Sequence, residues 1–570
     1  MRIRIALATL LALFALLTLF DRFILIEMLL LRTAVPLLAA AGVALACIGI
    51  GALARGTDKA DAPIDLLLGY PLFGTLCFLV GTIKVGPWVM GTVVVLGAAA
   101  GALLLFAAFK AESAVRVPGT HGWALFAVMA VLLCGFVSAQ APPSSLDELA
   151  YHLAVPHAWV NDGRAVELPL LSHSYFPLGI ESADLPLLAL LGPSDGGVAS
   201  HLLHLLAALA TTAVILRRTG SWLVTAAVVT TPALAITAGW SLVDWPLTGL
   251  FVVLLVAAES GDSRLASTAT AAGLLTKYTF LPFAAVAWAI HRKRPHWIVL
   301  AGSVFFIRNL ILTGNPVAPF LSAGAPHVSG FRALALSDHV FDSTFLDEAL
   351  GASIVALPVF AAGLLPIASA LMALGLFFLG PSSRILVPYL VVPALSATAA
   401  LQKRWFAALI SIAVIVQTFL VIWLTARGGA FSLLAGGVSE ADYLRGQRPV
   451  YAAIESIDQQ LPSGSRTLVV GTGETYWFTR PVRGGGNFDG PRLSHYLDVP
   501  TPEALRARFR ADGITHVALI TVPIPSNVPG KVEERQVVLT PTSQRMLAIT
   551  LDRYAAGVTS RSDATLFTLR

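Results

Sequence analysis

A polar segment between two apolar stretches contains the residues best suited to chemistry. Residues 142–178, PPSSLDELAYHLAVPHAWVNDGRAVELPLLSHSYFPL, include the adjacent carboxylates of Asp147 and Glu148, directly after a hydrophobic helix is expected to end. A positioned carboxylate can accept the proton of an attacking hydroxyl group, which is the work of a general base. Carboxylates at the mouth of a helical membrane bundle therefore suggest chemistry at the surface of the bilayer.

The same two carboxylates also have a structural interpretation. Residues 145–148, Ser-Leu-Asp-Glu, fit a capping box, in which Ser145 caps a new helix and Glu148 reaches back to the Ser145 amide. Asp147, in the first turn, would gain about 0.3–1 kcal/mol from the helix dipole. The sequence leaves open whether Glu148 is a capping residue or shares in catalysis.

A helix is predicted over residues 146–155, ended by the proline that follows it. Residues four apart share a helix face. Asp147 would therefore lie beside Tyr151, and Glu148 beside His152. An acid, a phenol and an imidazole would then project from one outward-facing helix.

Other polar residues could line the same pocket. His173 and Tyr175 follow in the run SHSYFPLGIE, and a solvated loop is the alternative for both. Asp244 stands between two apolar runs in SLVDWPL, where an acid is costly unless it faces water or a partner. A solvated turn before Pro246 is the alternative for Asp244.

Two pairs of residues bring positive charge to the ends of apolar runs. Lys277-Tyr278 interrupts a hydrophobic stretch, and Arg308-Asn309 ends another. A phosphate ligand near an outer membrane surface calls for cations of this kind. Arg308 could also extend to the interface without binding any substrate.

The composition indicates a polytopic membrane protein. Of 570 residues, 56% are hydrophobic and only 12% are charged, and the mean hydropathy is +0.77. Soluble domains carry about twice that charged fraction. No basic patch is interleaved with aromatic residues, so a nucleic-acid partner is not expected. The three cysteines, Cys47, Cys77 and Cys134, all lie in apolar runs and imply neither disulfides nor a cysteine metal site.

The apolar runs predict about 13 to 15 membrane spans, several of them short. They cover residues 5–20, 34–54, 66–83, 86–108, 123–139, 198–216, 221–239, 245–258, 265–277, 279–290, 296–312, 349–364, 366–380, 385–401 and 405–426. In this layout the positive clusters fall on one side: Arg2/Arg4, Arg55/Lys59, Lys110/Arg116, Arg217/Arg218, Arg292–Arg294 and Lys403/Arg404. The positive-inside rule then predicts that the N-terminus lies in the cytoplasm. The protein is expected in the plasma (inner) membrane.

Four regions follow from this topology. They are N-terminal transmembrane helices (1–139), an extracytoplasmic catalytic loop (140–197), a transmembrane core with outward loops (198–427) and a soluble extracytoplasmic α/β domain (428–570). In the last region, residues 467–471, 516–520 and 564–569 are predicted to be buried strands. Thr501-Pro502 is predicted to start a helix. The fold class is thus mainly α, a polytopic helical membrane bundle with a C-terminal α/β domain.

An ordered set of motifs resembles the integral-membrane glycosyltransferases of the GT-C superfamily. The motifs are LDELAYHLAVPHAWVNDGR, SHSYFPLGIE, SLVDWPL, GLLTKYTFLPF and RNLILTGNPVAPF, in this order over residues 120–430. The set is similar to bacterial members of the protein mannosyltransferase and aminoarabinose transferase group. The exported tail with RFRADGITHVALI also looks like such proteins.

The resemblance implies transfer of a sugar from a polyprenyl-phosphate donor to an envelope acceptor on the outer face of the membrane. Asp147 matches an acid in the first large exported loop that acts as a base or helps to hold a metal, and Asp244 matches the acid of the second exported loop. Lys277 and Arg308 would be candidates for binding the leaving lipid phosphate. The candidate site residues are therefore Asp147, Glu148 and Asp244 for catalysis, and Tyr151, His152, His173, Tyr175, Lys277, Tyr278, Arg308 and Asn309 for substrate binding.

With one acid as base and no obvious covalent nucleophile, direct displacement with inversion is the preferred mechanism. Carboxylates suit Mg²⁺ or Mn²⁺, yet two acids on separate loops form no recognisable metal motif, so a divalent cation is left open. The alternative function is a transporter or flippase for a lipid or amphiphile. Transporters place polar groups near the bilayer midplane and often contain inverted repeats, whereas these acids cluster at one surface and no repeat is found.

Overall fold

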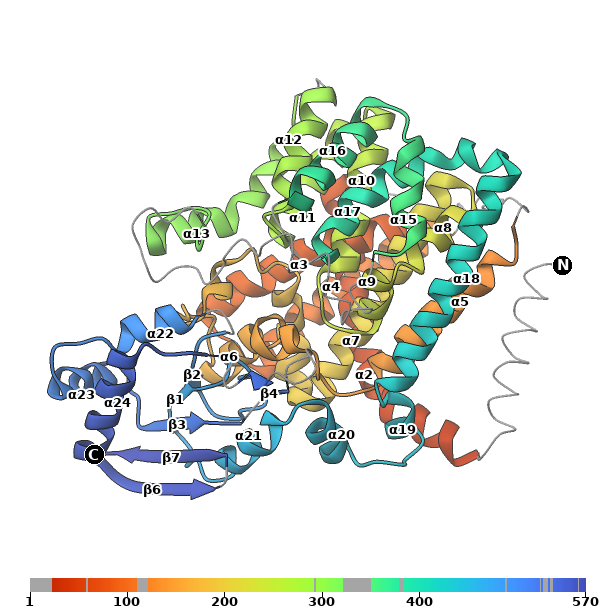
Figure 1. Cartoon of the computed structure of the whole chain (residues 1–570). Coiled ribbons are helices and arrows are strands. Elements are labelled where there is room, and N and C mark those ends of the chain that lie inside the picture. Colours follow the sequence, from red (N-terminus) through yellow and green to blue (C-terminus); the bar gives the residue numbers. More distant parts are fainter. Residues whose placement is uncertain are drawn as a thin grey trace.

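The computed structural model describes residues 23–57, 60–109, 121–291, 294–320, 350–378, 383–486, 489–522, 524–525, 532–533, 537–561 and 563–570. Within these residues a helical bundle is joined to a small α/β domain (Figure 1). The predicted fold class is confirmed. The predicted span 5–20 and most of the outward segment 308–348 lie outside the described residues.

Every predicted apolar run that the structure describes is helical. The helices of the bundle are α2 (Phe23–Arg55), α3 (Ala62–Ile83), α4 (Pro87–Phe109), α5 (Ala124–Ala139), α7 (Leu185–Thr219), α8 (Trp222–Val229), α9 (Pro232–Ala235), η4 (Ile236–Gly239), α10 (Asp244–Ser260), α11 (Ser263–Thr276), α12 (Phe280–His291), η5 (Trp297–Ser303), α13 (Val304–Thr313), α15 (Ala352–Ala356), η6 (Leu357–Phe360), α16 (Leu364–Phe378), α17 (Ser383–Ser396), η7 (Ala397–Gln402) and α18 (Arg404–Arg427). The break at Lys277 between α11 and α12 confirms the predicted helical pair.

Six helices of the described residues are long and apolar enough to cross a membrane. A seventh candidate is the pair Trp222–Val229 and Pro232–Gly239, which is bent by 74°, and four shorter apolar helices accompany them. Large apolar side chains lie exposed on the outside of the bundle, among them Trp88 at 90% and Ile83 at 79%. Exposed apolar surface of this kind is what lipid contact requires. The chain is an integral membrane protein.

Small residues let the first helices pack closely. A Cβ atom added at Gly69 of α3 would lie 1.7 Å from the carbonyl oxygen of Cys47 on α2, and one at Gly101 of α4 would lie 1.9 Å from that of Leu45. Such glycines allow helix backbones to touch, which is a common basis of helix association in membranes. Helix α2 therefore forms the centre of the α2–α3–α4 group.

The C-terminal part is built on a mixed sheet of order β2-β1-β3-β7-β6. Its strands are β1 (Thr467–Val470), β2 (Val482–Arg483), β3 (His516–Ile520), β6 (Ala555–Arg561) and β7 (Ala564–Leu569), and a separate pair is formed by β4 (Ile524–Pro525) and β5 (Val532–Glu533). The three predicted strands are confirmed as β1, β3 and β7. β1 is parallel to β2 and β3, and β7 is antiparallel to β3 and β6.

Helices complete the C-terminal part. They are α19 (Ala430–Leu434), α20 (Glu440–Gln447), α21 (Val450–Asp458), α22 (Gly490–Leu497), α23 (Pro502–Ala511) and α24 (Pro541–Tyr554). Thr501 caps α23 by accepting a hydrogen bond from the Ala504 amide, which confirms the predicted helix start. Leu505 of α23 and Leu547 of α24 belong to one apolar core of the sheet, and Ile454 of α21 belongs to another. The domain lies at the end of the bundle where α18 ends (Figure 1).

Candidate active site

The acid-bearing segment is a π-helix rather than the predicted α-helix. The π-helix η1 spans Glu148–His152, and the Leu153 amide donates to the Glu148 carbonyl oxygen over 3.0 Å. The next helix, α6 (Ala154–Asp162), includes Pro156 in its first turn, so the prediction of a helix over 146–155 ended by that proline is wrong. The four-residue spacing argument therefore does not hold for Asp147 with Tyr151 or for Glu148 with His152.

Arg384, at the start of α17, lies between the two acids that the sequence assigns to catalysis. Its Nη2 donates to Oδ2 of Asp147 over 2.5 Å, and its Nη1 lies 3.8 Å from Oδ2 of Asp244. The Asp147 side chain keeps 30% of its surface exposed, against 8% for Asp244. One guanidinium thus joins Asp147 and Asp244 into a single charged centre.

The charges around Asp147 keep it ionised. Burial disfavours the charged carboxylate, but Arg384 outweighs this effect, and Lys277 adds to it, so the pKa of Asp147 lies below its ordinary value. The side-chain ammonium group of Lys277 has no hydrogen bond or ion pair to any residue that the structure describes, although its backbone amide bonds to the Gly273 carbonyl oxygen. A half-buried cation without a partner beside a carboxylate is suited to binding an anion.

Glu148 points away from this charged centre and is fully buried. Its Oε1 accepts hydrogen bonds from His201 Nε2 at 2.7 Å and from the Ser241 amide at 2.6 Å, and its Oε2 accepts from the Ser145 amide at 3.0 Å. Burial opposes ionisation, but His201 and these amides lower the pKa of Glu148. The reach back to Ser145 confirms half of the capping box, while the Ser145 side chain makes no cap.

Three aromatic rings stack behind Asp147. The Tyr151 ring lies 3.9 Å from that of His152 and 4.3 Å from that of His173, centroid to centroid. Nδ1 of His152 lies 2.8 Å from Oε1 of Glu181. Burial, with the positive charges of Lys277 and Arg384, lowers the pKa of His152 well below its usual value, so the ring is neutral. His173 is buried, at 6% exposure, and is not part of a solvated loop.

The remaining candidates form a second cluster around Tyr175. Asn309 Nδ2 donates to the Tyr175 carbonyl oxygen over 2.6 Å and lies 2.8 Å from the Tyr278 hydroxyl. The Tyr278 hydroxyl also donates to the Tyr175 carbonyl oxygen over 3.1 Å. Arg308 donates to the Ser174 carbonyl oxygen over 2.7 Å, and its guanidinium lies 5.8 Å from the centre of the Tyr175 ring. Asn309 and Tyr278 thereby hold the 3₁₀ turn η2 (Ser172–Tyr175) in place.

The C-terminal domain clamps the acid-bearing segment. The amides of Thr475 and Tyr476 donate to the Leu149 carbonyl oxygen over 3.0 and 3.3 Å. The buried Tyr476 ring packs against Leu149 and Leu188, and its hydroxyl donates to the Pro193 carbonyl oxygen over 2.5 Å. That bond reaches the break in α7 at Gly192, where the backbone leaves helical geometry.

A second contact from the same domain fixes the η2 turn. Asp489 accepts hydrogen bonds from the Ser172 amide at 3.1 Å and from the Gly486 amide at 2.7 Å. Arg483 lies 3.0 Å from a carboxylate oxygen of Asp162 at the end of α6. The domain therefore contacts both the π-helix and the turn that carries His173 and Tyr175.

The described residues around Asp147 offer no set of three side-chain ligands for a divalent cation. Among the described residues, no group of three or more His, Cys, Asp or Glu side chains is placed to hold a metal. Arg384 already brings positive charge between Asp147 and Asp244. A Mg²⁺ or Mn²⁺ ion shared by these two carboxylates would compete with this guanidinium.

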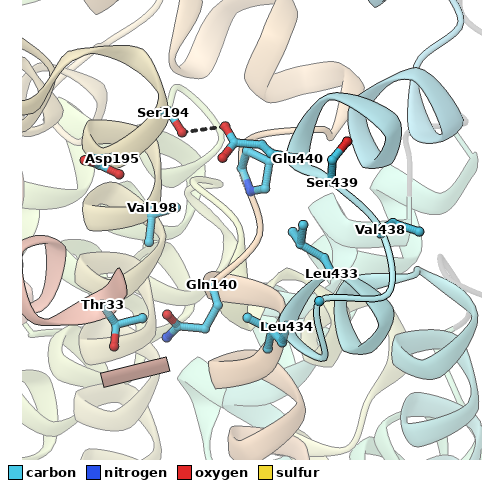
Figure 2. Close-up of a pocket in the computed structure, with 12 residues that line it drawn as sticks. Thr33, Gln140, Ser194, Asp195, Val198, Leu433, Leu434, Val438, Ser439 and Glu440 are labelled. Carbon is cyan, nitrogen blue, oxygen red and sulfur yellow. Dashed lines mark hydrogen bonds between the residues drawn. The ribbon is translucent and has the colours of Figure 1, made fainter. Parts of the chain in front are cut away.

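Two cavities lie beside the chain that leads into Asp147. The larger, of about 290 Å³, is lined by Gln140, Ser194, Leu433 and Glu440 among others, and Ser194 donates to Glu440 over 2.6 Å (Figure 2). The smaller, of about 210 Å³, is lined by Ser144 and His201, and both cavities include Pro142 in their walls. His201 connects the smaller cavity to Glu148.

Sequence reasoning missed four residues of this site: Arg384, His201, Tyr476 and Asp489. Arg384 stands directly before an apolar run, and this position is a signal that can be read from the sequence. His201 is an ionisable side chain inside an apolar run, which is a reason to expect a buried partner. Tyr476 and Asp489 lie in the C-terminal domain, where no motif indicates contact with the bundle.

No protein-family model matches the sequence, and no curated protein does. The fold is similar to two crystal structures of ArnT from Cupriavidus metallidurans. The first, bound to undecaprenyl phosphate, is 15% identical, has a TM-score of 0.48 and covers 79% of this chain and 98% of its own. The second, in the apo state, is 15% identical, has a TM-score of 0.47 and covers 78% and 97%. ArnT is an aminoarabinose transferase with the GT-C fold, of the group that the sequence resembles.

Proposed function

We propose that the chain is a glycosyltransferase that moves a sugar from a polyprenyl-phosphate donor to an acceptor at the outer face of the membrane. The observation that carries the proposal is the arrangement of Asp147, Arg384 and Lys277: an ionised, partly exposed carboxylate beside one bridging and one unpartnered cation. This arrangement offers a base and an anion site within one centre. A donor with a long apolar tail accounts for the location of the centre in a membrane bundle.

The reaction assigns a role to each of these side chains. The acceptor hydroxyl attacks the anomeric carbon of the donor and passes its proton to the Asp147 carboxylate. The bond between the anomeric carbon and the phosphate oxygen breaks, and its electrons leave with the polyprenyl phosphate. Arg384 and Lys277 stabilise the negative charge that develops on the departing phosphate. Direct attack of the acceptor inverts the anomeric centre.

The ion pair between Arg384 and Asp147 also links donor binding to catalysis. While Arg384 is paired with Asp147, the pKa of that carboxylate is lowered and the carboxylate is a weak base. A donor phosphate that draws the guanidinium charge to itself raises the basicity of Asp147. The base thus becomes effective when the leaving group is in place. Asp244, at 3.8 Å from Arg384, keeps the guanidinium between the acids.

The test is turnover by the purified full chain in lipid nanodiscs, with a panel of polyprenyl-phosphate sugars and envelope membranes as the acceptor source. The proposal expects release of polyprenyl phosphate for at least one donor, dependent on Arg384 and Asp147. Movement of labelled lipid across the bilayer without any release would contradict it and support the transporter. Bound donor with no release in the presence of membranes would also contradict it.

A further inference from the structure

The smaller of the two cavities has a composition unlike that of the charged centre at Asp147. Its described lining residues are Ser138, Ala141, Pro142, Ser144, His201, Ile236, Trp240, Leu424, Thr425, Gly428, Ala430, Tyr443 and Gln447, none of which is Asp, Glu, Lys or Arg. Hydroxyl, amide and imidazole groups alternate with two aromatic rings and aliphatic side chains. Gln447 is exposed, so the wall of the cavity reaches the surface of the protein.

Two polar groups in this wall have no partner among the described residues. His201 Nε2 is bonded to Glu148, while Nδ1 of the same buried ring has no hydrogen bond. The indole N–H of Trp240, whose side chain is only partly buried, makes none either. A buried polar atom without a partner, such as His201 Nδ1, is destabilising, and a ligand hydroxyl group would relieve this cost. Because Nε2 is bonded to Glu148, Nδ1 is the ring nitrogen left to form a hydrogen bond with such a hydroxyl.

The cavity lies on the opposite side of the acid pair from the cations. Asp147 faces Arg384, whereas Glu148 faces His201 and the Ser241 amide, next to Trp240. Ser144, three residues before Asp147, is in the wall, and its hydroxyl lies 3.3 Å from that of Tyr443. A molecule bound in this cavity would lie on the Glu148 side of the acid pair, whereas the donor phosphate would lie on the Asp147 side, next to Arg384.

We propose that this cavity binds a neutral sugar unit of the acceptor. The identification of the ligand as the acceptor rests on the proposed function, whereas the binding site itself is inferred from the geometry of the cavity. A sugar ring has apolar C–H faces for Trp240 and Tyr443 and hydroxyl groups for Ser144, His201 and Gln447. An engineered cavity of ~150 Å³ holds benzene, so about 210 Å³ accommodates one six-membered ring with substituents.

A charged ligand does not suit the cavity. A phosphate or carboxylate group calls for Arg, Lys or several amides, and the described wall contains neither cation. Burying an unpaired charge is far more costly than burying hydroxyl groups that find partners. The adjoining larger cavity shares Pro142 with this one and has Gln140 in its wall, whose amide nitrogen and oxygen are buried without a partner (Figure 2). A second sugar unit of a longer acceptor extends into it.

The test measures binding without turnover. In the full chain in nanodiscs, the Ser144→Cys variant is treated with a neutral methanethiosulfonate reagent; wild type, whose three cysteines are buried, is the blank. The proposal expects at least one of the methyl glycosides of glucose, galactose and mannose to slow modification at least threefold. Glucose 1-phosphate and glycerol at the same concentration should not slow it.

Trp240→Ala in the same background should abolish this protection, while Trp423→Ala, on the exposed side of α18 beside a wall residue, should leave it unchanged. No protection by any of the three glycosides would overturn the proposal, as would equal protection by glucose 1-phosphate. Protection that survives Trp240→Ala would overturn it as well. Donor turnover without protection by any glycoside would contradict this sugar site but not the proposed function. Protection without donor turnover would support the sugar site and contradict the proposed function.

Discussion

Arg384 and Asp147 are 237 residues apart in the sequence and 2.5 Å apart in the structure. The guanidinium also approaches Asp244, so three parts of the chain meet at one charged centre. The pair accounts for two properties that a transferase needs in the same place, an ionised base and a cation for a leaving phosphate. Substitutions in this centre should lower turnover, whereas substitutions in the buried contacts around it should lower stability.

Replacement of Arg384 should act on the chemical step. Arg384→Ala removes the cation assigned to the developing phosphate charge, and loss of one such donor typically lowers kcat about 10²–10³-fold. Arg384→Lys keeps the charge but not the two-pronged geometry, and an intermediate loss is expected. Steady-state release of polyprenyl phosphate measures both. Arg427→Ala, at the C-terminal end of α18, is the matched control and should keep full turnover. An Arg384→Ala enzyme as active as this control would show that Arg384 does not stabilise the leaving phosphate.

Glu148 should behave as a structural residue. Its carboxylate accepts three hydrogen bonds, and in Glu148→Gln one of the donors would face an amide N–H. The expected cost is about 1–3 kcal/mol of stability. The thermal unfolding midpoint should fall, while turnover per folded molecule stays within a few-fold of wild type. Loss of turnover at an unchanged midpoint would instead place Glu148 in catalysis.

The Tyr476 side chain should hold the C-terminal domain against the π-helix. Tyr476→Ala empties a fully buried aromatic site, for which about 3–5 kcal/mol is typical. Tyr476→Phe loses only the bond to the Pro193 carbonyl oxygen, at about 1 kcal/mol. Hydrogen exchange at the amides of Thr475 and Tyr476 should rise strongly in the first variant and weakly in the second. Unchanged exchange in Tyr476→Ala would show that the clamp does not depend on this ring.

Acid should weaken the contact between the C-terminal domain and the acid-bearing segment, because His157 becomes protonated. Burial lowers its pKa from 6.5 to about 4, and its ring lies 5.1 Å from that of Tyr476. Below pH 6.5 the unfolded chain binds a proton that the folded chain excludes, so stability falls between pH 6.5 and pH 4 and is fully present above. Between pH 7 and pH 5 the loss is about 2 kcal/mol.

This pH effect is measured as the difference in thermal midpoint between pH 7.5 and pH 5.0. His157→Gln should show a smaller difference than wild type, and His495→Gln, on an exposed position of α22, should match wild type. An identical difference in all three proteins would exclude His157 as the source.

Chelation should leave turnover unchanged. Arg384 occupies the position between Asp147 and Asp244 that a divalent cation would need, and supplies the positive charge itself. Treatment with EDTA should therefore change the rate of polyprenyl phosphate release less than twofold. A larger loss that Mg²⁺ or Mn²⁺ restores would show that the metal, and not the guanidinium, serves the two acids.

The sequence predicts the architecture well because hydrophobicity over 15 to 20 residues is a local property. Each apolar run that the structure describes became a helix, and the three β-rich runs of the tail became β1, β3 and β7. Asp147, Asp244 and Lys277 could be selected as candidates from the sequence because each is a charged residue at the edge of an apolar run. A charge in such a position is energetically costly, which makes it a candidate for function.

Long-range contacts set the features that the sequence did not predict. Within the π-helix, the Leu149 carbonyl oxygen accepts hydrogen bonds from the amides of Thr475 and Tyr476, which lie over 300 residues away in the sequence. Propensity along residues 146–155 favours an α-helix and contains no sign of these donors. The partners of Arg384 are likewise set by helix packing. The solvated loop that was the alternative for His173 is excluded for the same reason, since His173 is buried and the C-terminal domain contacts its turn through Asp489 and Ser172.

The most direct test of the account compares wild type and Asp147→Asn in single turnovers of bound polyprenyl-phosphate sugar. Asparagine keeps the size of the side chain and an oxygen for Arg384 but cannot accept the proton of the acceptor hydroxyl. The account predicts donor binding and thermal midpoint close to those of wild type, with release of polyprenyl phosphate slower by about 10²–10⁴-fold. Release at the wild-type rate in Asp147→Asn would contradict the assignment of Asp147 as the base.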